Sequence, residues 1–144
     1  MQPGRKGAVI AIDHGTKSTG FAVTDALRAS LQPLAPFRGG RAELLDHIEE
    51  LAGERDVEAF VVGLPLNMRG DEGPRAKDVR GFLAELAARF PLVRVVALDE
   101  RLTTKAGEEL LREQGVRGAR ARELRDSASA VVLLRDWLAS GEPS

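Results

Sequence analysis

The fold is decided by residues 8–24, whose sequence is AVIAIDHGTKSTGFAVT. The apolar run 8–12 ends in polar Asp13, His14 and Gly15, which is typical of a buried strand that stops at a turn. A second apolar run, 20–24, begins after only seven residues. Because seven residues are too few for a helical crossover, we expect the two strands to pair as a hairpin.

The rest of the chain predicts one more antiparallel strand and then an alternation of helix and strand. Residues 34–37 form a weaker strand, which Pro33 and Pro36 restrict to an edge of the sheet. The alternation that follows predicts parallel strands covered by helices. The expected elements are a helix over 44–52, a strand over 57–63, a helix over 76–90, a strand over 93–98, a helix from Thr103 or Thr104 to about 114, a loop over 115–122 and a last helix over 123–138.

The composition fits a single domain over residues 1–144, with frayed ends at 1–7 and 140–144. Hydrophobic residues make up 43% of the chain and charged residues 30%, and 21 basic side chains nearly balance 22 acidic ones. The net charge of -1 and the pI of about 6.2 differ from the pI above about 9 that is typical of a nucleic-acid-binding domain. The first residues do not resemble a signal peptide and no apolar run has membrane-spanning length, so we expect a cytoplasmic protein without membrane contact.

Any metal site in this chain must use mainly carboxylate oxygens. The sequence contains no cysteine, and its only imidazoles are His14 and His47. We expect neither histidine to be a ligand, and we place His47 among the exposed charges of a surface helix. Oxygen ligands suit Mg²⁺ or Mn²⁺.

Acidic residues stand at three places where an apolar element ends or begins. Asp13 closes the first strand, Asp99 and Glu100 close the strand before residue 100, and Asp126 opens the last helix at the head of an apolar stripe. Since successive residues of a strand point to opposite faces, only one of Asp99 and Glu100 can join Asp13. Three converging carboxylates would repel one another unless a divalent metal neutralised them. Two such ions can activate a water for attack on a phosphodiester.

Each of these features also has another interpretation. An acid after a strand is often only a turn former, and Asp126 fits a first-turn acid that complements the helix dipole. The turn from Asp13 through Thr16 to Lys17 can also cradle a phosphate with backbone N–H groups, as at the start of actin-like and sugar-kinase ATPases. Those folds enclose ATP between two lobes, and this chain has the length of one.

Four segments spread over about residues 8–138 carry a resemblance to a known family. They are 10–25 (IAIDHGTKSTGFAVTD), 62–70 (VGLPLNMRG), 98–104 (LDERLTT) and 126–130 (DSASA). In order and content they resemble the four signatures of the YqgF/RuvX family of RNase H-like nucleases. The resemblance implies an α/β, RNase H-like fold with a central mixed five-stranded sheet flanked by helices.

The resemblance also implies a hydrolase, namely a divalent-metal-dependent nuclease. It makes Asp13, Glu100 and Asp126 the catalytic carboxylates and the ligands of two Mg²⁺ or Mn²⁺ ions, with water attacking phosphorus and the 3′-oxygen departing. The residues assigned to nucleic-acid contact beside these acids are Thr16, Lys17, Asn67, Arg69, Arg101, Thr103 and Thr104. Asn67 and Arg69 lie in a Gly/Pro-rich loop that also fits a plain strand-to-helix connection. The sequence departs from the family at Ser18 and Thr19, where Arg followed by a hydrophobic residue is usual.

The near-zero net charge is a cancellation between two segments. Residues 46–58 carry six acids and one Arg, a net of -5, whereas residues 112–125 carry five Arg and two Glu, a net of +3. Because the basic segment leads directly to Asp126, we expect Arg117, Arg120 and Arg122 to bind a phosphate backbone.

The resemblance implies two substrates, and these residues do not discriminate between them. We favour the 5′ end of pre-16S rRNA, processed during ribosome biogenesis. The alternative is a Holliday junction in recombination and repair, which a homodimer would cut symmetrically, so the expected partner is structured pre-rRNA or branched DNA. Two hypotheses from other classes are a non-catalytic nucleic-acid-binding module and a small actin-like ATP-binding protein.

Overall fold

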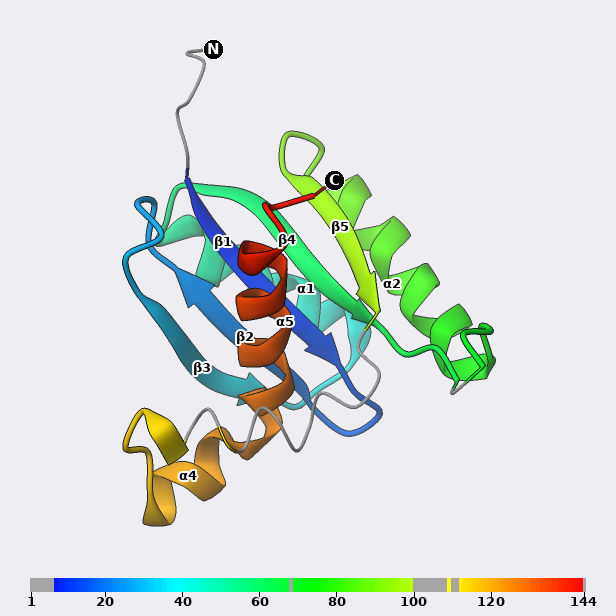
Figure 1. Ribbon diagram of the computed structural model, residues 1–144. Coiled ribbons are helices and arrows are strands. Elements are labelled where there is room, and N and C mark those ends of the chain that lie inside the picture. Colours follow the sequence, from blue (N-terminus) through cyan, green and yellow to red (C-terminus); the bar gives the residue numbers. More distant parts are fainter. Residues whose placement is uncertain (1–6, 68, 100–108, 110–111, 144) are drawn as a thin grey trace.

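The computed structural model describes residues 7–67, 69–99, 109 and 112–143. Its centre is a five-stranded mixed sheet with helices on both faces (Figure 1). The strands are β1 (Ala8–His14), β2 (Thr19–Thr24), β3 (Leu31–Phe37), β4 (Val57–Leu64) and β5 (Arg94–Asp99), in the order β3-β2-β1-β4-β5. The helices are α1 (Arg41–Gly53), α2 (Pro74–Arg89), α4 (Gly118–Leu124) and α5 (Ala128–Ala139), with a 3-10 turn, η1 (Arg125–Ser127), before α5.

Strands β1 and β2 form the predicted antiparallel hairpin. Asp13 lies directly opposite Gly20 in the pairing. A hydrogen bond from the N–H of Gly15 to the carbonyl oxygen of Ser18, at 3.0 Å, closes the turn between the strands. The seven residues between the apolar runs therefore make a tight connection, as the sequence predicts.

Strand β3 occupies the edge of the sheet beside β2, as predicted. Pro33 and Pro36 have no N–H to donate, and only an edge strand tolerates two such residues. The strand begins at Leu31, earlier than the predicted residue 34. Its pairing with β2 shifts register between Thr19 and Phe21.

Strands β1, β4 and β5 run parallel, which confirms the prediction drawn from helix and strand alternation. Ile12 of β1 lies beside Val62 of β4, and Gly63 lies beside Leu98 of β5. The carboxyl ends of these three strands therefore meet at one edge of the sheet.

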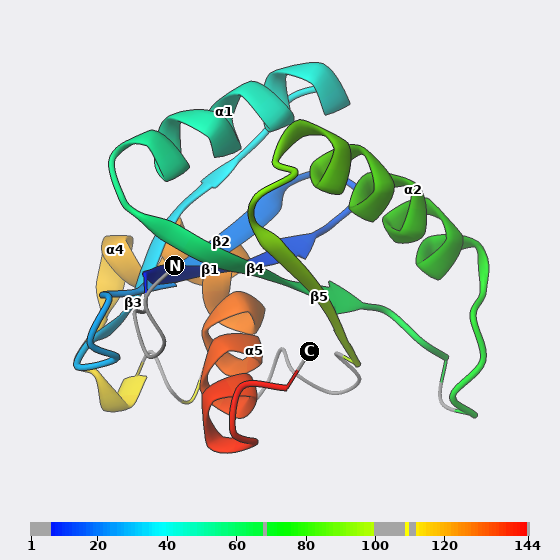
Figure 2. The same ribbon diagram turned by 90° about the horizontal axis from the view of Figure 1, so that it is seen from above.

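The sheet lies between two layers of helix. Helices α1 and α2 cover one face and α5 covers the other (Figure 2). Because side chains alternate along a strand, Ile12 of β1 enters the cluster under α1 and α2, whereas Ala11 enters the cluster under α5. The same alternation directs Asp13 to the α5 side and His14 to the α1/α2 side. Within the described residues, no helix combines the length and apolar character needed to cross a membrane.

The segment that leads to the last helix differs from the prediction of a loop over 115–122 and one helix over 123–138. Helix α4 occupies part of the predicted loop, and η1 interrupts the predicted helix. The chain is non-helical over residues 114–117, and Gly115 and Gly118 in this stretch and at its end have φ of +79° and +64°, which favours glycine. Residues 119–124 are good helix formers. The predicted helix over 103–114 lies mainly outside the described residues. Within this range, the described residues 109, 112 and 113 are helical.

Residues 142 and 143, within the segment predicted to be a frayed end, take part in two contacts. The indole Nε1 of Trp137 donates to the carbonyl oxygen of Pro143 at 2.7 Å. The carboxylate of Glu142 accepts from the guanidinium of Arg28 at 3.0 Å. Two specific contacts therefore hold residues 142 and 143 against the body of the protein.

We expect Trp137→Ala to lower the free energy of unfolding by about 3–5 kcal/mol, because the indole is fully buried under the sheet. Trp137→Phe retains an aromatic ring but loses the hydrogen bond to Pro143. Its loss of unfolding free energy should therefore be smaller than that of Trp137→Ala, with about 1 kcal/mol of it due to the hydrogen bond. Because Trp137 is the only tryptophan of the chain, tryptophan fluorescence cannot follow the unfolding of these variants. Urea unfolding of both is therefore measured by circular dichroism. Equal losses for the two variants would contradict this account.

Candidate active site

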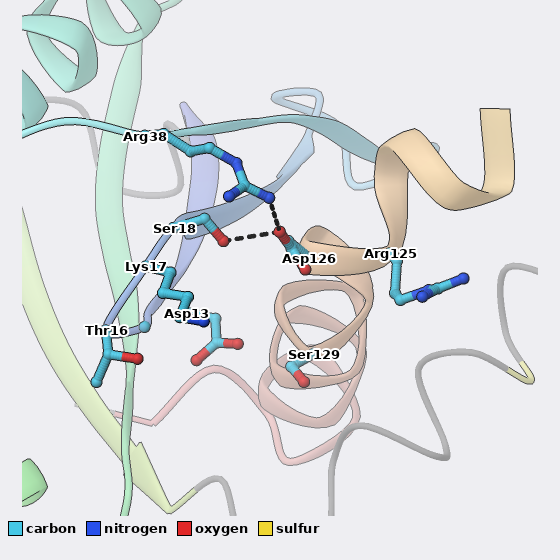
Figure 3. Close-up of a pocket in the computed structure, with 9 residues that line it drawn as sticks. Asp13, Thr16, Lys17, Ser18, Arg38, Arg125, Asp126 and Ser129 are labelled. Atoms are coloured by element: carbon cyan, nitrogen blue, oxygen red, sulfur yellow. Dashed lines mark hydrogen bonds and ion pairs between the residues drawn. The ribbon is translucent and has the colours of Figure 1, made fainter. Parts of the chain in front are cut away.

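A hollow of about 390 Å³ lies at the carboxyl end of β1, on the α5 side of the sheet. Its walls come from the β1–β2 turn, from the residue after β3, and from η1 with the start of α5 (Figure 3). The lining residues are Asp13, Gly15, Thr16, Lys17, Ser18, Arg38, Arg125, Asp126 and Ser129. Two of the three predicted catalytic acids therefore share one hollow with three basic side chains.

The two acids come together because Gly20 has no side chain. Gly20 lies opposite Asp13 in the hairpin. A Cβ atom on Gly20 would lie 2.7 Å from the Cα of Ser127, and closer still to the carbonyl oxygen of Asp126. Only glycine lets the η1 backbone approach β2 so closely, and this approach brings Asp126 to the end of β1.

The side chain of Ser127 anchors η1 in the sheet. Its hydroxyl is fully buried, accepts from the N–H of Phe21 at 3.0 Å, and donates to the carbonyl oxygen of Leu34 at 2.6 Å. Phe21 and Leu34 lie opposite each other beside the register shift between β2 and β3. The hydroxyl thus bridges two strands where their ladder is irregular, and it holds the neighbouring Asp126 at the hollow.

One oxygen of Asp126 receives two hydrogen bonds. The hydroxyl of Ser18 donates to Oδ2 at 2.8 Å, and Nη2 of Arg38 donates to the same oxygen at 3.3 Å (Figure 3). The Arg38 side chain is 69% exposed and that of Asp126 is 39% exposed. Within the described residues, Oδ1 of Asp126 accepts no hydrogen bond, so this oxygen is available to a cation.

The donor chemistry of the hollow suits a hard divalent cation. Asp13 and Asp126 supply carboxylate oxygens, the ligands that Mg²⁺ and Mn²⁺ prefer. In the part of the chain that the structure describes, no three His, Asp or Glu side chains come together as a metal cluster. Glu100, the third predicted ligand, lies outside the described residues. Asp99 ends β5 and is not among the residues that line the hollow.

The predicted nucleic-acid contacts fall into different regions of the molecule. Thr16 and Lys17 line the hollow. Asn67 and Arg69 are not among its lining residues. The side-chain oxygen of Asn67 accepts the N–H groups of Arg69 at 2.9 Å and of Asp71 at 3.0 Å. Those bonds close the loop on itself and favour a strand-to-helix connection, so a substrate contact there stays a prediction.

Of the basic segment 112–125, only the last residue, Arg125, is among the described residues that line the hollow. Arg117 lies just before α4 and Arg120 lies within it. Both are exposed, and neither is a lining residue of the hollow. Their contact with a phosphate backbone stays a prediction. The side chain of Arg122, and the whole of Arg101, Thr103 and Thr104, lie outside what the structure describes.

Four lining residues escape the sequence reasoning as contributors to the site: Ser18, Arg38, Arg125 and Ser129. Ser18 stands at a position noted only for its departure from the family pattern. Arg38 follows an edge strand and is far from either acid in sequence, so no local motif points to it. Figure 3 shows Arg125 beside Asp126 with its guanidinium directed away from Asp13.

Both histidines pack on the α1/α2 side of the sheet, away from the hollow. The ring of His14 stacks on Phe82 with 4.5 Å between centroids, and burial lowers the pKa of His14 below its usual value. His47 stacks on Phe37 at 4.7 Å instead of lying among exposed charges. The prediction for His47 was wrong because the helix turns this residue inward onto an aromatic of β3.

A mixed five-stranded sheet in the order β3-β2-β1-β4-β5, flanked by helices on both faces, is an RNase H-like fold. Among solved structures, Thermus thermophilus RuvC in complex with a Holliday junction substrate superposes with a TM-score of 0.62, at 17% identity, over 94% of this chain and 96% of that one. The chain belongs to the RuvX family, whose model, described as Holliday junction resolvase, matches residues 7–140. It is thus a member of a family of nucleases, and the resemblance seen in the sequence is confirmed.

Relatives of similar length support the family assignment. A protein of Rhodobacter capsulatus is 39% identical over 135 residues, which are 93% of this chain and 84% of the relative. A protein of Nocardioides sp. is 40% identical over 138 residues, which cover 93% of this chain and 88% of the relative. Each carries the name "Putative pre-16S rRNA nuclease".

We expect Gly20→Ala to lower the free energy of unfolding by about 1–3 kcal/mol or more, because the added methyl group meets the backbone of η1. The matched control is Gly81→Ala in the middle of α2, where a Cβ meets nothing within 4 Å. Alanine there should stabilise the helix by about 0.5–1 kcal/mol. Thermal unfolding measures both, and a neutral Gly20→Ala would show that η1 does not depend on this close approach.

Proposed function

We propose that the protein is a divalent-metal-dependent nuclease whose reaction takes place in the hollow at the end of β1. The observation that carries the proposal is the convergence of Asp13 and Asp126, from opposite ends of the chain, in one hollow with Lys17 and Arg38. Carboxylates attract a cation, and basic side chains attract phosphate. The site thus combines the two requirements of phosphodiester hydrolysis.

In this proposal Asp13 and Asp126 hold Mg²⁺ or Mn²⁺ together with Glu100. The fold family implies two ions. When bound, such ions lower the pKa of water and balance charge on the leaving oxygen. Ser18 holds one oxygen of Asp126 at 2.8 Å and so fixes the orientation of its carboxylate.

The reaction is hydrolysis of a phosphodiester. Water oxygen forms a bond to phosphorus, the bond from phosphorus to the 3′-oxygen breaks, and the departing oxygen takes up a proton, which leaves a 5′-phosphate. Lys17 and Thr16 lie in the turn after Asp13, on the wall of the hollow, where they would contact the phosphate oxygens.

The substrate that we propose is the 5′ end of pre-16S rRNA, in ribosome biogenesis. Support comes from the relatives in Rhodobacter capsulatus and Nocardioides sp., which carry the name "Putative pre-16S rRNA nuclease" and match over most of both chains. The alternative is the Holliday junction, and its support is the description of the family model. A junction is cut symmetrically by two sites, so this alternative calls for a homodimer.

We expect Asp13→Asn and Asp126→Asn each to reduce cleavage at least about a hundredfold, because each removes a ligand charge from the proposed metal site. Glu100→Gln tests the third predicted ligand in the same way. The matched control is Asp136→Asn on α5, whose carboxylate pairs with Arg135 outside the hollow. EDTA should abolish wild-type cleavage and excess Mn²⁺ should restore it. Full activity in Asp13→Asn would show that the chemistry lies elsewhere.

The two substrates are separated by offering the same preparation a pre-16S rRNA 5′ mimic and a four-way DNA junction. Processing of rRNA predicts a single cut in the RNA and an intact junction. Resolution predicts paired symmetric cuts in the DNA and a solution mass, by light scattering, of twice that of the chain. A junction cut in pairs by a dimer, with the RNA left intact, would reject the favoured substrate.

A further inference from the structure

The feature that carries a further inference is Arg38, which no sequence motif marks. Arg38 follows Phe37, the last residue of β3, and the ring of Phe37 stacks on His47 of α1. Since successive side chains leave a strand on opposite faces, Arg38 turns toward the other face, where the hollow lies. Figure 3 shows its guanidinium directly above Asp126.

The guanidinium is held only loosely in this position. Its one partner among the described residues is Oδ2 of Asp126, at 3.3 Å from Nη2. The side chain is 69% exposed, and ion pairs as exposed as this one contribute little to stability. An arginine carries five N–H donors in a planar fork, so most of the donors of Arg38 remain available to another acceptor.

The position of Arg38 opposes a metal and favours a phosphate. Its positive charge lies beside the carboxylate that would hold the metal, which lowers the attraction of Asp126 for a second cation. A phosphate entering the hollow would offer the same guanidinium two oxygens at once, a stronger acceptor than a single carboxylate oxygen. Lys17 lines the same hollow and would add a second cation for that phosphate.

We propose that Arg38 is an exchangeable cation, the counter-ion of Asp126 in the free protein and a ligand of the nucleic-acid backbone in the complex. The inference rests on the proposed function, because it takes Asp126 to be a metal ligand and the hollow to be the substrate site. It adds a binding residue and a sequence of events. Arg38 leaves Asp126 as metal and substrate enter, and it then holds a phosphate beside the reacting bond.

The exchange has a consequence that a purely structural role lacks. Removing the charge of Arg38 should tighten metal binding in the absence of nucleic acid and weaken nucleic-acid binding. A residue that only supported the local fold would weaken both when replaced. Exchange of partners by Arg38 therefore predicts that the two affinities move in opposite directions.

The test compares wild type with Arg38→Gln and Arg38→Lys. Calorimetric titration with MnCl₂ alone should show about two- to fivefold tighter binding to Arg38→Gln. Fluorescence anisotropy with a labelled RNA hairpin in EDTA, which prevents cleavage, should show about three- to tenfold weaker binding. Plotted against log salt concentration, log affinity falls with a negative slope. The magnitude of this slope should decrease by about one for Arg38→Gln and stay at the wild-type value for Arg38→Lys, which keeps the charge.

The matched control is Arg135→Gln, since Arg135 is 51% exposed and pairs with Asp136 at the same 3.3 Å, but outside the hollow. Neither affinity should change in this variant. If wild type binds both MnCl₂ and the hairpin while Arg38→Gln weakens both or changes neither, the inference about Arg38 is wrong and the proposed nuclease stands. If wild type binds neither ligand, the proposed function fails and the inference fails with it.

Discussion

The contact on which the site depends is the approach of the η1 backbone to β2 at Gly20. This contact has no room for a Cβ atom, and the buried hydroxyl of Ser127 secures it from the other side by bridging Phe21 and Leu34. The backbone of Asp126 forms the first of these contacts with Gly20, and Ser127, which forms the second, is the next residue in the chain. Two residues without charge therefore decide where a charged residue lies.

The charge of the site is local, and the composition of the whole chain conceals it. The net charge of -1 suggests a protein with no preference for nucleic acid. The hollow nevertheless places Lys17, Arg38 and Arg125 around Asp13 and Asp126. In the proposed function, a phosphate in the hollow would meet these side chains at close range, whereas distant surface charges are screened by salt. We therefore expect affinity for nucleic acid to depend on this local arrangement more than on the net charge of the chain.

Ser18, one of the two positions noted as a departure from the family pattern, has a structural role in the site. Ser18 stands where the family usually has Arg, and its hydroxyl donates to the oxygen of Asp126 that Arg38 also contacts. A neutral donor holds the carboxylate from the β1–β2 turn, and the cation comes from Arg38, the residue after β3. The edge strand β3 thereby positions a residue of the site.

The sequence alone determined most of the strands and helices and the antiparallel and parallel halves of the sheet, because hydrophobic period, proline position and loop length act over short distances. The hairpin, the edge strand, the parallel half and the side of the sheet that Asp13 faces all follow from such local rules. Local rules do not report which distant residues meet. Hence the 3-10 turn at Asp126, the inward packing of His47 and the place of Arg38 in the hollow became visible only in the structure. Tertiary structure decided them because each depends on a contact between different elements: the close approach at Gly20 for the 3-10 turn, the stacking on Phe37 for His47, and the pairing with Asp126 for Arg38.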